Sequence, residues 1–345
     1  MQLKLAALAI LTWASLPAQQ FYQLESALTI KSPTSPSWDY LTYDSAHDQL
    51  LIARRDDGIL IYDAKAKKLT GAIEDSKGGN STVLLPEFDR GYIVKQDGTL
   101  LIIQASTLKK IGSVSVGNNA DNAFYDPATQ QLLVTQGDSS QVTFVDAKSG
   151  ALTGVLKIDS ESIEGAAADG EGNFYTALRD RDKVVKIDAR AHTLVAEWKI
   201  GKHIKPNGVA YDTANKRLFV TTRGDNPALL VYDPSGQIVA EQTIGLNNDS
   251  IVFDPGTKKI YTANGWDATL VIINQVDANT YKLAEAATTR PWARTMALDP
   301  KTKTVYLVTA EGTVDPSKPW KTSVAPFYPN KYFKDTFTLL TYTRK

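Results

Sequence analysis

The stretch that decides the fold is HIKPNGVAYD, residues His203–Asp212. Its ending, an apolar run closed by an aspartate, recurs along the chain. The other copies are DYLTYD (39–44), DNAFYD (121–126), EGAAAD (164–169), DSIVFD (249–254), RTMALD (294–299) and a looser VLLPEFD (83–89). The closing aspartates stand at positions 44, 89, 126, 169, 212, 254 and 299. Seven copies about 40–45 residues apart indicate a repeat architecture with four strands per unit.

The residues after each aspartate support this interpretation. A turn of proline or small polar residues comes first, as in PATQQ (127–131), TANKR (213–217) and PGTKK (255–259). A β-branched or aromatic run follows, as in LFVTT (218–222) and IYTAN (260–264), and then two more strands with alternating pattern. No segment has the apolar stripe of a helix. The sequence predicts an all-β fold, a seven-bladed β-propeller with four-stranded blades.

The two ends of the chain are expected to form one blade together. The seventh repeat has predicted strands at Thr295–Asp299, Val305–Thr309 and Thr336–Arg344, which is one strand short of a blade. The strand-like segment Gln23–Lys31 precedes the first repeat. Pairing it into the last blade would close the ring and remove an exposed sheet edge. We therefore expect residues 19–345 to form a single seven-bladed domain.

Composition limits the chemistry available to this chain. Its 345 residues include 38 basic and 38 acidic ones, so no bulk field favours nucleic acid or an anionic membrane. Cysteine is absent, which excludes disulfides, thiolate metal sites and a cysteine nucleophile, and the only histidines are His47, His192 and His203. No Ser-His-Asp order, phosphate-binding glycine loop or paired metal-histidine motif is present. We predict no catalytic residues.

The first residues suggest export. An apolar run from Leu5 to Leu16 follows one lysine and precedes Pro17-Ala18. The run is too short to span a bilayer comfortably, so residues 1–18 are predicted to be a cleaved signal peptide, with an uncleaved anchor as the alternative. An exported chain without cysteine points to a bacterial envelope, in the periplasm or secreted. No other stretch is apolar enough to span a membrane.

Runs such as IYTAN (260–264) beside VFDPGTKK (252–259) resemble the YVTN-type repeat of the YncE-like exported propellers. The resemblance covers about residues 20–345 and implies fold more strongly than function. WD40 repeats are a poorer match, since the third strands end in Tyr-Asp, Val-Asp or Ile-Asp. YncE-like proteins have been linked to DNA, but the neutral net charge argues against strong binding to a nucleic-acid backbone.

The start of each innermost strand should line the mouth of the central channel. Asn207 stands five residues before its repeat aspartate. The same register holds Asp39, Asp121, Glu164, Asp249 and Arg294, and in the second repeat Leu84 or, after a shift, Asn80. The sequence thus predicts a mostly acidic ring with an arginine beside it. Turn preference alone would select the same polar residues.

Three of these positions suggest a metal. Asn207, Asp249 and Asp39 resemble in register the cation ligands of gluconolactonase/regucalcin propellers. That resemblance implies Ca²⁺ or another divalent cation held by oxygen ligands. However, that family has six blades, and Ser250 stands where its glycine would be. No other cofactor is indicated.

The loops between second and third strands open on the same face as this ring. They contain Arg54, Arg55, Lys95, Arg179, Arg223 and Trp266, and His203 precedes Pro206-Asn207 closely enough to reach the mouth. In the last repeat this loop is expanded to Gly312–Asp335. A structureless loop beyond ~15 residues is usually functional or disordered. Its aromatics favour packing across the face, either as a lid over a ligand, near Trp266 and Arg223, or as a structural plug.

These observations favour an exported, non-enzymatic propeller, expected to be a monomer. It would bind a small ligand, a glycan or a partner protein on the channel-mouth face. Three alternatives stay open: a metal-dependent lactonase-like hydrolase using Asp39, Asn207 and Asp249, a structural envelope scaffold, and a binder of single-stranded DNA. The proposed ligand-contacting residues are Asp39, Asp121, Glu164, Asn207, Asp249, Arg294, Arg223, Trp266 and His203.

Overall fold

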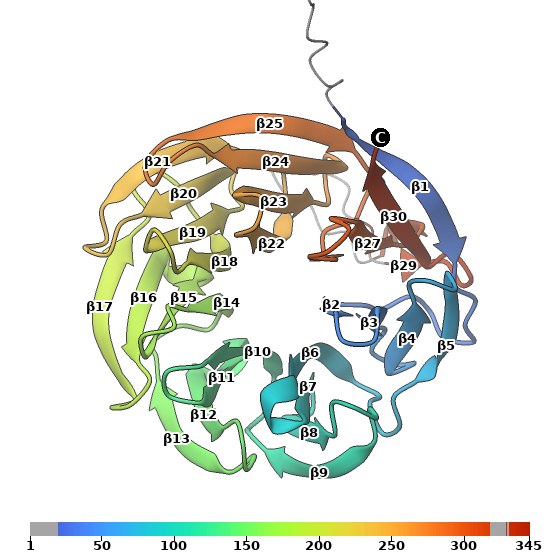
Figure 1. The fold of residues 1–345 in the computed structure, drawn as a ribbon, viewed down its shortest axis with the longest axis horizontal. Coiled ribbons are helices and arrows are strands. Elements are labelled where there is room, and N and C mark those ends of the chain that lie inside the picture. The colour runs from blue at the N-terminus through green and yellow to red at the C-terminus, as the bar shows by residue number, and fades with distance from the viewer. Residues whose placement is uncertain (1–19, 318–328, 330) are drawn as a thin grey trace, which may run out of the picture.

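Each repeat folds into one antiparallel sheet of four strands, and seven such sheets are arranged as blades around a central channel (Figure 1). The computed structural model describes residues 20–317, 329 and 331–345. The sequence-based prediction of a seven-bladed β-propeller is confirmed. The predicted signal peptide, residues 1–18, lies outside the described residues. No helix in the described part of the chain is long and apolar enough to cross a membrane.

The blades follow one another in chain order, from the innermost strand outward. Blade 1 contains β2 (Leu41–Asp44), β3 (Gln49–Ala53), β4 (Ile59–Asp63) and β5 (Lys68–Ala72). Blade 2 contains β6 (Gly79–Leu85), β7 (Arg90–Lys95), β8 (Thr99–Ile103) and β9 (Lys110–Ser115). Blade 3 contains β10 (Ala120–Asp126), β11 (Gln131–Gln136), β12 (Gln141–Asp146) and β13 (Leu152–Lys157). Blade 4 contains β14 (Ile163–Ala168), β15 (Asn173–Leu178), β16 (Lys183–Asp188) and β17 (Thr193–Lys199).

The remaining blades have the same order. Blade 5 contains β18 (Pro206–Asp212), β19 (Arg217–Thr222), β20 (Ala228–Tyr232) and β21 (Ile238–Thr243). Blade 6 contains β22 (Asn248–Asp254), β23 (Lys259–Asn264), β24 (Thr269–Gln275) and β25 (Tyr281–Thr288). Blade 7 contains β26 (Met296–Leu298), β27 (Val305–Thr309), β30 (Thr338–Arg344) and β1 (Tyr22–Thr29). The described part of the chain also has three short 3₁₀ helices, η1 (Pro86–Phe88), η2 (Gly137–Ser139) and η3 (Arg179–Arg181).

The first strand closes the ring, as predicted. β1 pairs antiparallel with β30, from Tyr22 opposite Arg344 to Thr29 opposite Thr338. The Tyr22 hydroxyl also donates a hydrogen bond of 2.8 Å to the carbonyl oxygen of Lys303, before β27. The start of the described chain is thereby joined to its end, and both lie at the rim of the same blade (Figure 1).

The repeat aspartate has a structural role in the first turn of six of the seven blades, whereas Asp89 of blade 2 accepts hydrogen bonds from Gln104 and Ser106. Asp212 accepts hydrogen bonds from the backbone N–H of Ala214 at 3.0 Å and the side chain of Asn215 at 2.7 Å. Asp254 makes the equivalent contacts with Gly256 and Thr257. Such side-chain caps satisfy backbone groups that a tight hairpin leaves unpaired. The residue that reveals the period is therefore a turn-former and does not reach the channel mouth.

Burial explains why the middle strands are so apolar. Every residue of β11 after the first is buried, because neighbouring blades cover both faces of the sheet. On the outermost strand β13, exposed and partly buried residues alternate instead. Between blades 3 and 4 the core includes Phe144 and Phe174, whose ring centroids are 6.5 Å apart. Burying each such side chain contributes roughly 1.5–3 kcal/mol.

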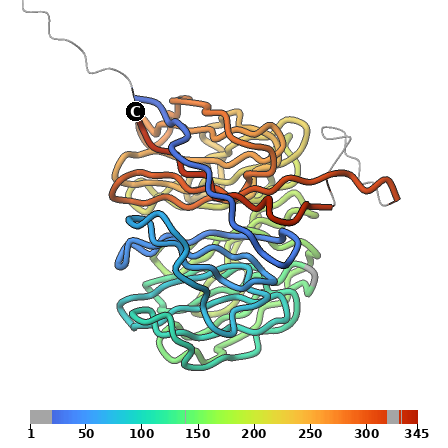
Figure 2. The backbone as a smooth tube through the Cα atoms, turned by 90° about the vertical axis from the view of Figure 1, so that its right-hand side faces the viewer, coloured from blue at the N-terminus to red at the C-terminus, as the bar shows by residue number. Residues whose placement is uncertain are grey.

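The long insertion of blade 7 is described only at its two ends. A short ladder joins β28 (Gly312–Thr313) to β29 (Lys331–Tyr332). Figure 2 shows the red chain near this ladder standing out from one face of the ring. The Tyr332 ring packs against Trp38 with centroids 5.0 Å apart, whereas Phe333 is exposed. Trp320, Phe327 and Tyr328 lie outside the described residues, so the choice between lid and plug stays a prediction.

Candidate functional site

The predicted channel-mouth residues come from the starts of the innermost strands. Antiparallel pairing returns each second strand to the same face, so the loops that follow second strands supply arginines there. We call the resulting set the mouth ring. It consists of Asp39, Asp121, Glu164, Asn207 and Asp249 with Arg55, Arg179, Arg223 and Arg294.

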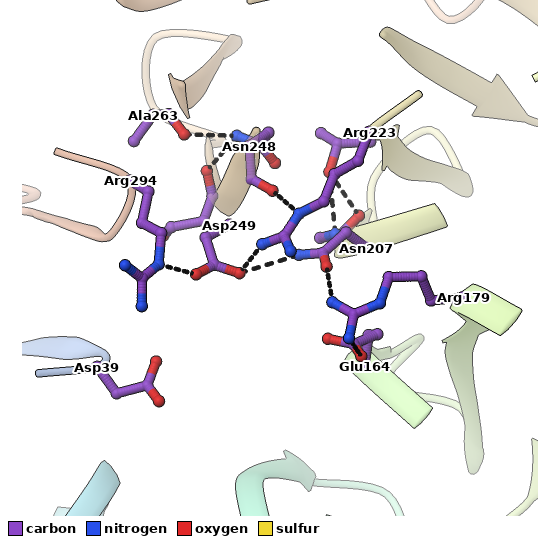
Figure 3. A network of polar contacts seen from close by, with 12 residues as sticks. Asp39, Glu164, Arg179, Asn207, Arg223, Asn248, Asp249, Ala263 and Arg294 are labelled. Atoms are coloured by element: carbon purple, nitrogen blue, oxygen red, sulfur yellow. Dashed lines mark hydrogen bonds and ion pairs between the residues drawn. The ribbon is translucent and has the colours of Figure 1, made fainter. Parts of the chain in front are cut away.

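Asp249 is the most heavily contacted carboxylate of the mouth ring. Its Oδ1 accepts hydrogen bonds from the Arg223 guanidinium and, at 3.3 Å, from the Asn207 side-chain amide. Its Oδ2 accepts a hydrogen bond from Arg294 Nε at 2.5 Å (Figure 3). Burial alone would raise the pKa of Asp249, but the two guanidinium groups outweigh it and the pKa lies below its usual value. This carboxylate is therefore held ionised.

Glu164, two blades away in blade 4, forms a second charged contact. Arg179 Nη2 lies 2.9 Å from Glu164 Oε1, which also accepts a hydrogen bond of 2.6 Å from Ser162. Arg179 Nη1 donates to Asn207 Oδ1 at 3.3 Å. The Asn207 side chain thus connects two corners of the ring, donating to Asp249 and accepting from Arg179 (Figure 3).

Glycines beside these residues allow the inner strands to approach closely. A Cβ on Gly208 would lie 2.9 Å from Thr221 Oγ1 and 3.0 Å from a side-chain carbon of Ile251. A Cβ on Gly165 would lie 2.8 Å from the Asn207 carbonyl oxygen. Larger residues would push neighbouring blades apart at the channel. The Asn-Gly step of HIKPNGVAYD is explained by this packing.

Asp39 pairs within its own blade. One of its oxygens accepts a hydrogen bond from the Arg55 guanidinium. Burial raises the pKa of Asp39, Arg55 opposes this shift, and the charge of Asp249 adds to it. The net pKa is raised, in contrast to that of Asp249.

Asp121 differs from the other three carboxylates because no described lysine, arginine or histidine lies within ion-pair distance of it. Its one side-chain contact within the described chain is with the Asn80 amide, whose Nδ2 lies 3.5 Å from Asp121 Oδ1. Burial raises the pKa of Asp121 well above its usual value, and the charges of Asp39, Glu164 and Asp249 raise it further. The contact also settles the register of the second repeat, since Asn80, the shifted choice, reaches the ring after a bulge between Gly79 and Ser81.

Tyr40 belongs to the same surroundings, although sequence reasoning did not select it. Burial raises the pKa of its phenol well above the usual value, and the charges of Asp121, Asp249, Asp39 and Glu164 act in the same direction. The phenol is therefore neutral at physiological pH. Its position directly after Asp39 is the only signal in the sequence that could have suggested it.

A cavity of about 240 Å³ opens beside Asp121. Its charged lining residues are Arg55, Asp121, Glu164 and Arg179. Its amide and hydroxyl lining residues are Asn80, Gln96, Asn119 and Ser162, with Ala120, Gly137 and Ile163 completing the wall. The cavity therefore offers donors and acceptors and little apolar surface.

The two remaining predicted site residues are His203 and Trp266. His203 is buried, with Nδ1 3.0 Å from the Asn226 carbonyl oxygen and Nε2 3.2 Å from Glu241 on β21, the outermost strand of blade 5. The expectation that His203 reaches the mouth is therefore corrected: Pro206 starts the inner strand, but the histidine packs toward the blade's outer edge. Trp266 follows β23 on the mouth face, and its backbone N–H donates to Leu246.

The suggested metal ligands do not form one oxygen cluster. Asn207 turns its amide nitrogen toward Asp249, and both Asp249 oxygens accept from arginines. Asp39 is engaged separately by Arg55. Across the described residues, no group of three histidines or carboxylates is placed to hold a metal ion.

No family model matches the chain. A curated relative, the "Uncharacterized protein YncE" of Salmonella typhimurium (strain LT2), is 24% identical over 187 residues, which are 53% of this chain and 52% of that protein. The chain is similar to YncE. It spans about half the length of this relative, and together with the seven-bladed ring the match supports the YncE-like resemblance drawn from the repeats.

Solved structures share the fold at low identity. A chain of the "Mitotic Checkpoint Complex" superposes with a TM-score of 0.70 at 14% identity, covering 89% of this chain and 95% of that one. The WD40 repeats of RRP9 give 0.72 at 10% identity, with 94% and 100% covered. "Kuenenia stuttgartiensis Hydrazine Synthase" gives 0.68 at 14%, with 81% and 94% covered. At such identities the likeness extends to the fold alone.

Proposed function

We propose that this protein is an exported, non-enzymatic β-propeller that binds a small polar ligand at the channel mouth. The observation that carries the proposal is the cavity beside Asp121, which combines two guanidinium groups, two carboxylates and several amides around about 240 Å³. Convergent polar groups in a concave site can fix the orientation of a small polar molecule. The cavity is too small for a glycan chain or a protein surface, so these partners are less favoured than a single small molecule.

The proposal assigns no catalysis to the mouth ring. A metal-dependent hydrolase would need free carboxylate oxygens, and the Asp249 oxygens are both engaged by arginines. A structural scaffold is the competing interpretation, because the ion pairs of the ring also hold the blades together. A ligand test must therefore block the cavity without breaking those ion pairs.

Gly137→Phe is suited to that test. Gly137 lines the cavity, and a Cβ there would find its nearest neighbours at 3.8 Å, so a larger side chain can enter the cavity. Gly71→Phe is the matched control, since Gly71 is exposed on β5 and a Cβ there has no neighbour within 4 Å.

The measurement is a thermal-shift screen of sugars, lactones, amino compounds and Ca²⁺, with and without EDTA, followed by calorimetric titration. We expect at least one organic compound to bind the parent protein and the Gly71→Phe variant, and to bind Gly137→Phe at least tenfold more weakly. A protein that binds no panel member, or binds them equally after Gly137→Phe, would support the scaffold. If EDTA abolished the shift in melting temperature, the result would favour the metal-dependent alternative.

A further inference from the structure

The mouth ring carries equal numbers of opposite charges, but they are unevenly distributed. Four carboxylates (Asp39, Asp121, Glu164, Asp249) face four arginines (Arg55, Arg179, Arg223, Arg294). Asp249 contacts two of the guanidinium groups, while Asp39 and Glu164 contact one each. None of these four arginines is left for Asp121. Two guanidinium groups therefore meet at Asp249, whereas the Asp121 carboxylate, which lines the cavity, has no described ion-pair partner.

A second unsatisfied group stands beside Asp121. Asn80 is 3% exposed and lines the same cavity. Its Nδ2 lies 3.4 Å from the Ala120 carbonyl oxygen and 3.5 Å from Asp121 Oδ1. Its Oδ1 is buried and has no hydrogen-bond partner among the described residues. A buried acceptor without a partner costs about 1–3 kcal/mol, so native proteins rarely leave one unmatched.

We propose that Asp121 and Asn80 bind the protonated primary amine of a small ligand. This inference rests on the proposed function and names the chemistry of its ligand. An ammonium group has one positive charge and three N–H donors, which match one uncompensated carboxylate and one amide oxygen without a partner. The charge of a bound amine would pair with the Asp121 carboxylate, which has no described ion-pair partner.

Other cations fit these groups less well. Ca²⁺ requires six to eight oxygen ligands, whereas Arg55 and Arg179 line the same cavity and would repel a doubly charged ion. A quaternary ammonium is usually held by aromatic faces, and no described aromatic residue lines this cavity. The guanidinium groups of Arg55 and Arg179 line the cavity and can donate to an oxygen elsewhere on the ligand.

Ethanolamine and choline provide a matched pair of probes. Both carry a positive charge and a hydroxyl oxygen, but choline has three methyl groups where ethanolamine has N–H donors. We expect calorimetric or NMR titration at neutral pH to give ethanolamine at least tenfold tighter binding than choline. Asp121→Asn should weaken ethanolamine binding at least tenfold, and Asn80→Leu should weaken it less because only a neutral acceptor is lost.

Asp159→Asn is the control variant, since Asp159 is a carboxylate that is 95% exposed, pairs with Arg181 and does not line the cavity. Circular dichroism would show that each variant folds. Equal affinity for the two probes, no ethanolamine binding to the parent protein, or full affinity in Asp121→Asn would overturn the inference. If ethanolamine does not bind but another compound does, and Gly137→Phe blocks that binding, the amine inference fails while the proposed function stands. Were no compound to bind at all, both would fail.

Discussion

Asp249 and Asp121 occupy the same position in their repeats, five residues before the closing aspartate, but their electrostatic surroundings are opposite. Arg223, Arg294 and Asn207 surround Asp249, and its pKa is lowered against the effect of burial. Around Asp121, burial and neighbouring carboxylates raise the pKa. The repeat therefore determines where a carboxylate stands, while the adjacent loops determine its charge state.

The loops explain the difference between the two positions. Arg223 directly follows β19 of blade 5 and reaches the carboxylate of blade 6. The residues directly after the second strands of blades 2 and 3 are instead Gln96 and Gly137, and the strands themselves end in Lys95 and Gln136. Lys95 pairs with Asp97 at 3.5 Å, and Gln136 donates to the Val116 carbonyl oxygen at 2.8 Å. Neither residue supplies a guanidinium to Asp121.

The largest effect is expected from Asp249→Asn. The substitution leaves Arg223 and Arg294 without their carboxylate, and breaking a buried ion pair on one side costs about 3–5 kcal/mol. Urea unfolding at pH 7 should show this loss in the free energy of unfolding. Asp159→Asn, on the exposed surface, should stay within about 0.5 kcal/mol of the parent. If Asp249→Asn lowered the free energy of unfolding by less than about 1 kcal/mol, the two arginines would have found other partners. The ion pairs of Asp249 would then contribute little to stability.

Asp121→Asn is expected to act in the opposite direction. Removing an uncompensated carboxylate should raise the free energy of unfolding by about 1 kcal/mol at pH 7, in the range of ordinary stabilising substitutions. The groups that act on Asp121 are Asp39 and Arg55 of blade 1, Glu164 of blade 4 and Asp249 of blade 6.

The pH dependence gives this prediction its sign. The pKa of Asp121 is raised on folding, so its favourable contribution is complete below the unfolded pKa and is lost as pH rises through the folded pKa. The free energies of unfolding of the parent and of Asp121→Asn should therefore agree at low pH and diverge as pH rises. Asp249 has a lowered pKa, so the stability it contributes is present above its unfolded pKa and lost on acidification. If the difference in unfolding free energy between the parent and Asp121→Asn instead grew toward low pH, the raised pKa of Asp121 would be contradicted.

The sequence predicted the fold well because the signals are local and repeated. Six of the seven repeat aspartates cap their own turns, and β11 and its equivalents are buried on both faces. The residue types at these positions therefore follow directly from the local structure. Val305–Thr309 was predicted with its observed bounds, and Met296–Leu298 within two residues. Closure by the N-terminal strand followed from counting strands.

The site was less predictable because it depends on contacts between repeats. Arg55 and Arg179 pair with carboxylates of their own blades, whereas Arg223 pairs with the next blade, and spacing alone does not distinguish these arrangements. The same ambiguity hid the side-chain contacts of Asn207, which suggested a metal ligand by register. His203 was misplaced because two neighbours in sequence can face opposite edges of a blade.

The smallest effect is expected from Tyr40→Phe. The Tyr40 phenol lies among the four carboxylates, but burial and their charges raise its pKa well above the usual value, so it contributes no charge at physiological pH. Removing its hydroxyl should change the free energy of unfolding by less than about 1 kcal/mol, the net value of a typical hydrogen bond. The parent and Asp121→Asn differ in their free energy of unfolding by an amount that depends on pH. This difference should be the same whether tyrosine or phenylalanine stands at position 40, and a double-mutant cycle at several pH values would measure it. Asp39→Asn in the same cycle is the contrast, since Asp39 is a charged neighbour that raises the pKa of Asp121, and its removal should reduce the difference. If Tyr40→Phe reduces this difference in unfolding free energy as much as Asp39→Asn does, the hydroxyl itself governs the protonation of Asp121. The contrast between Asp121 and Asp249 could then not be explained by the placement of charges alone.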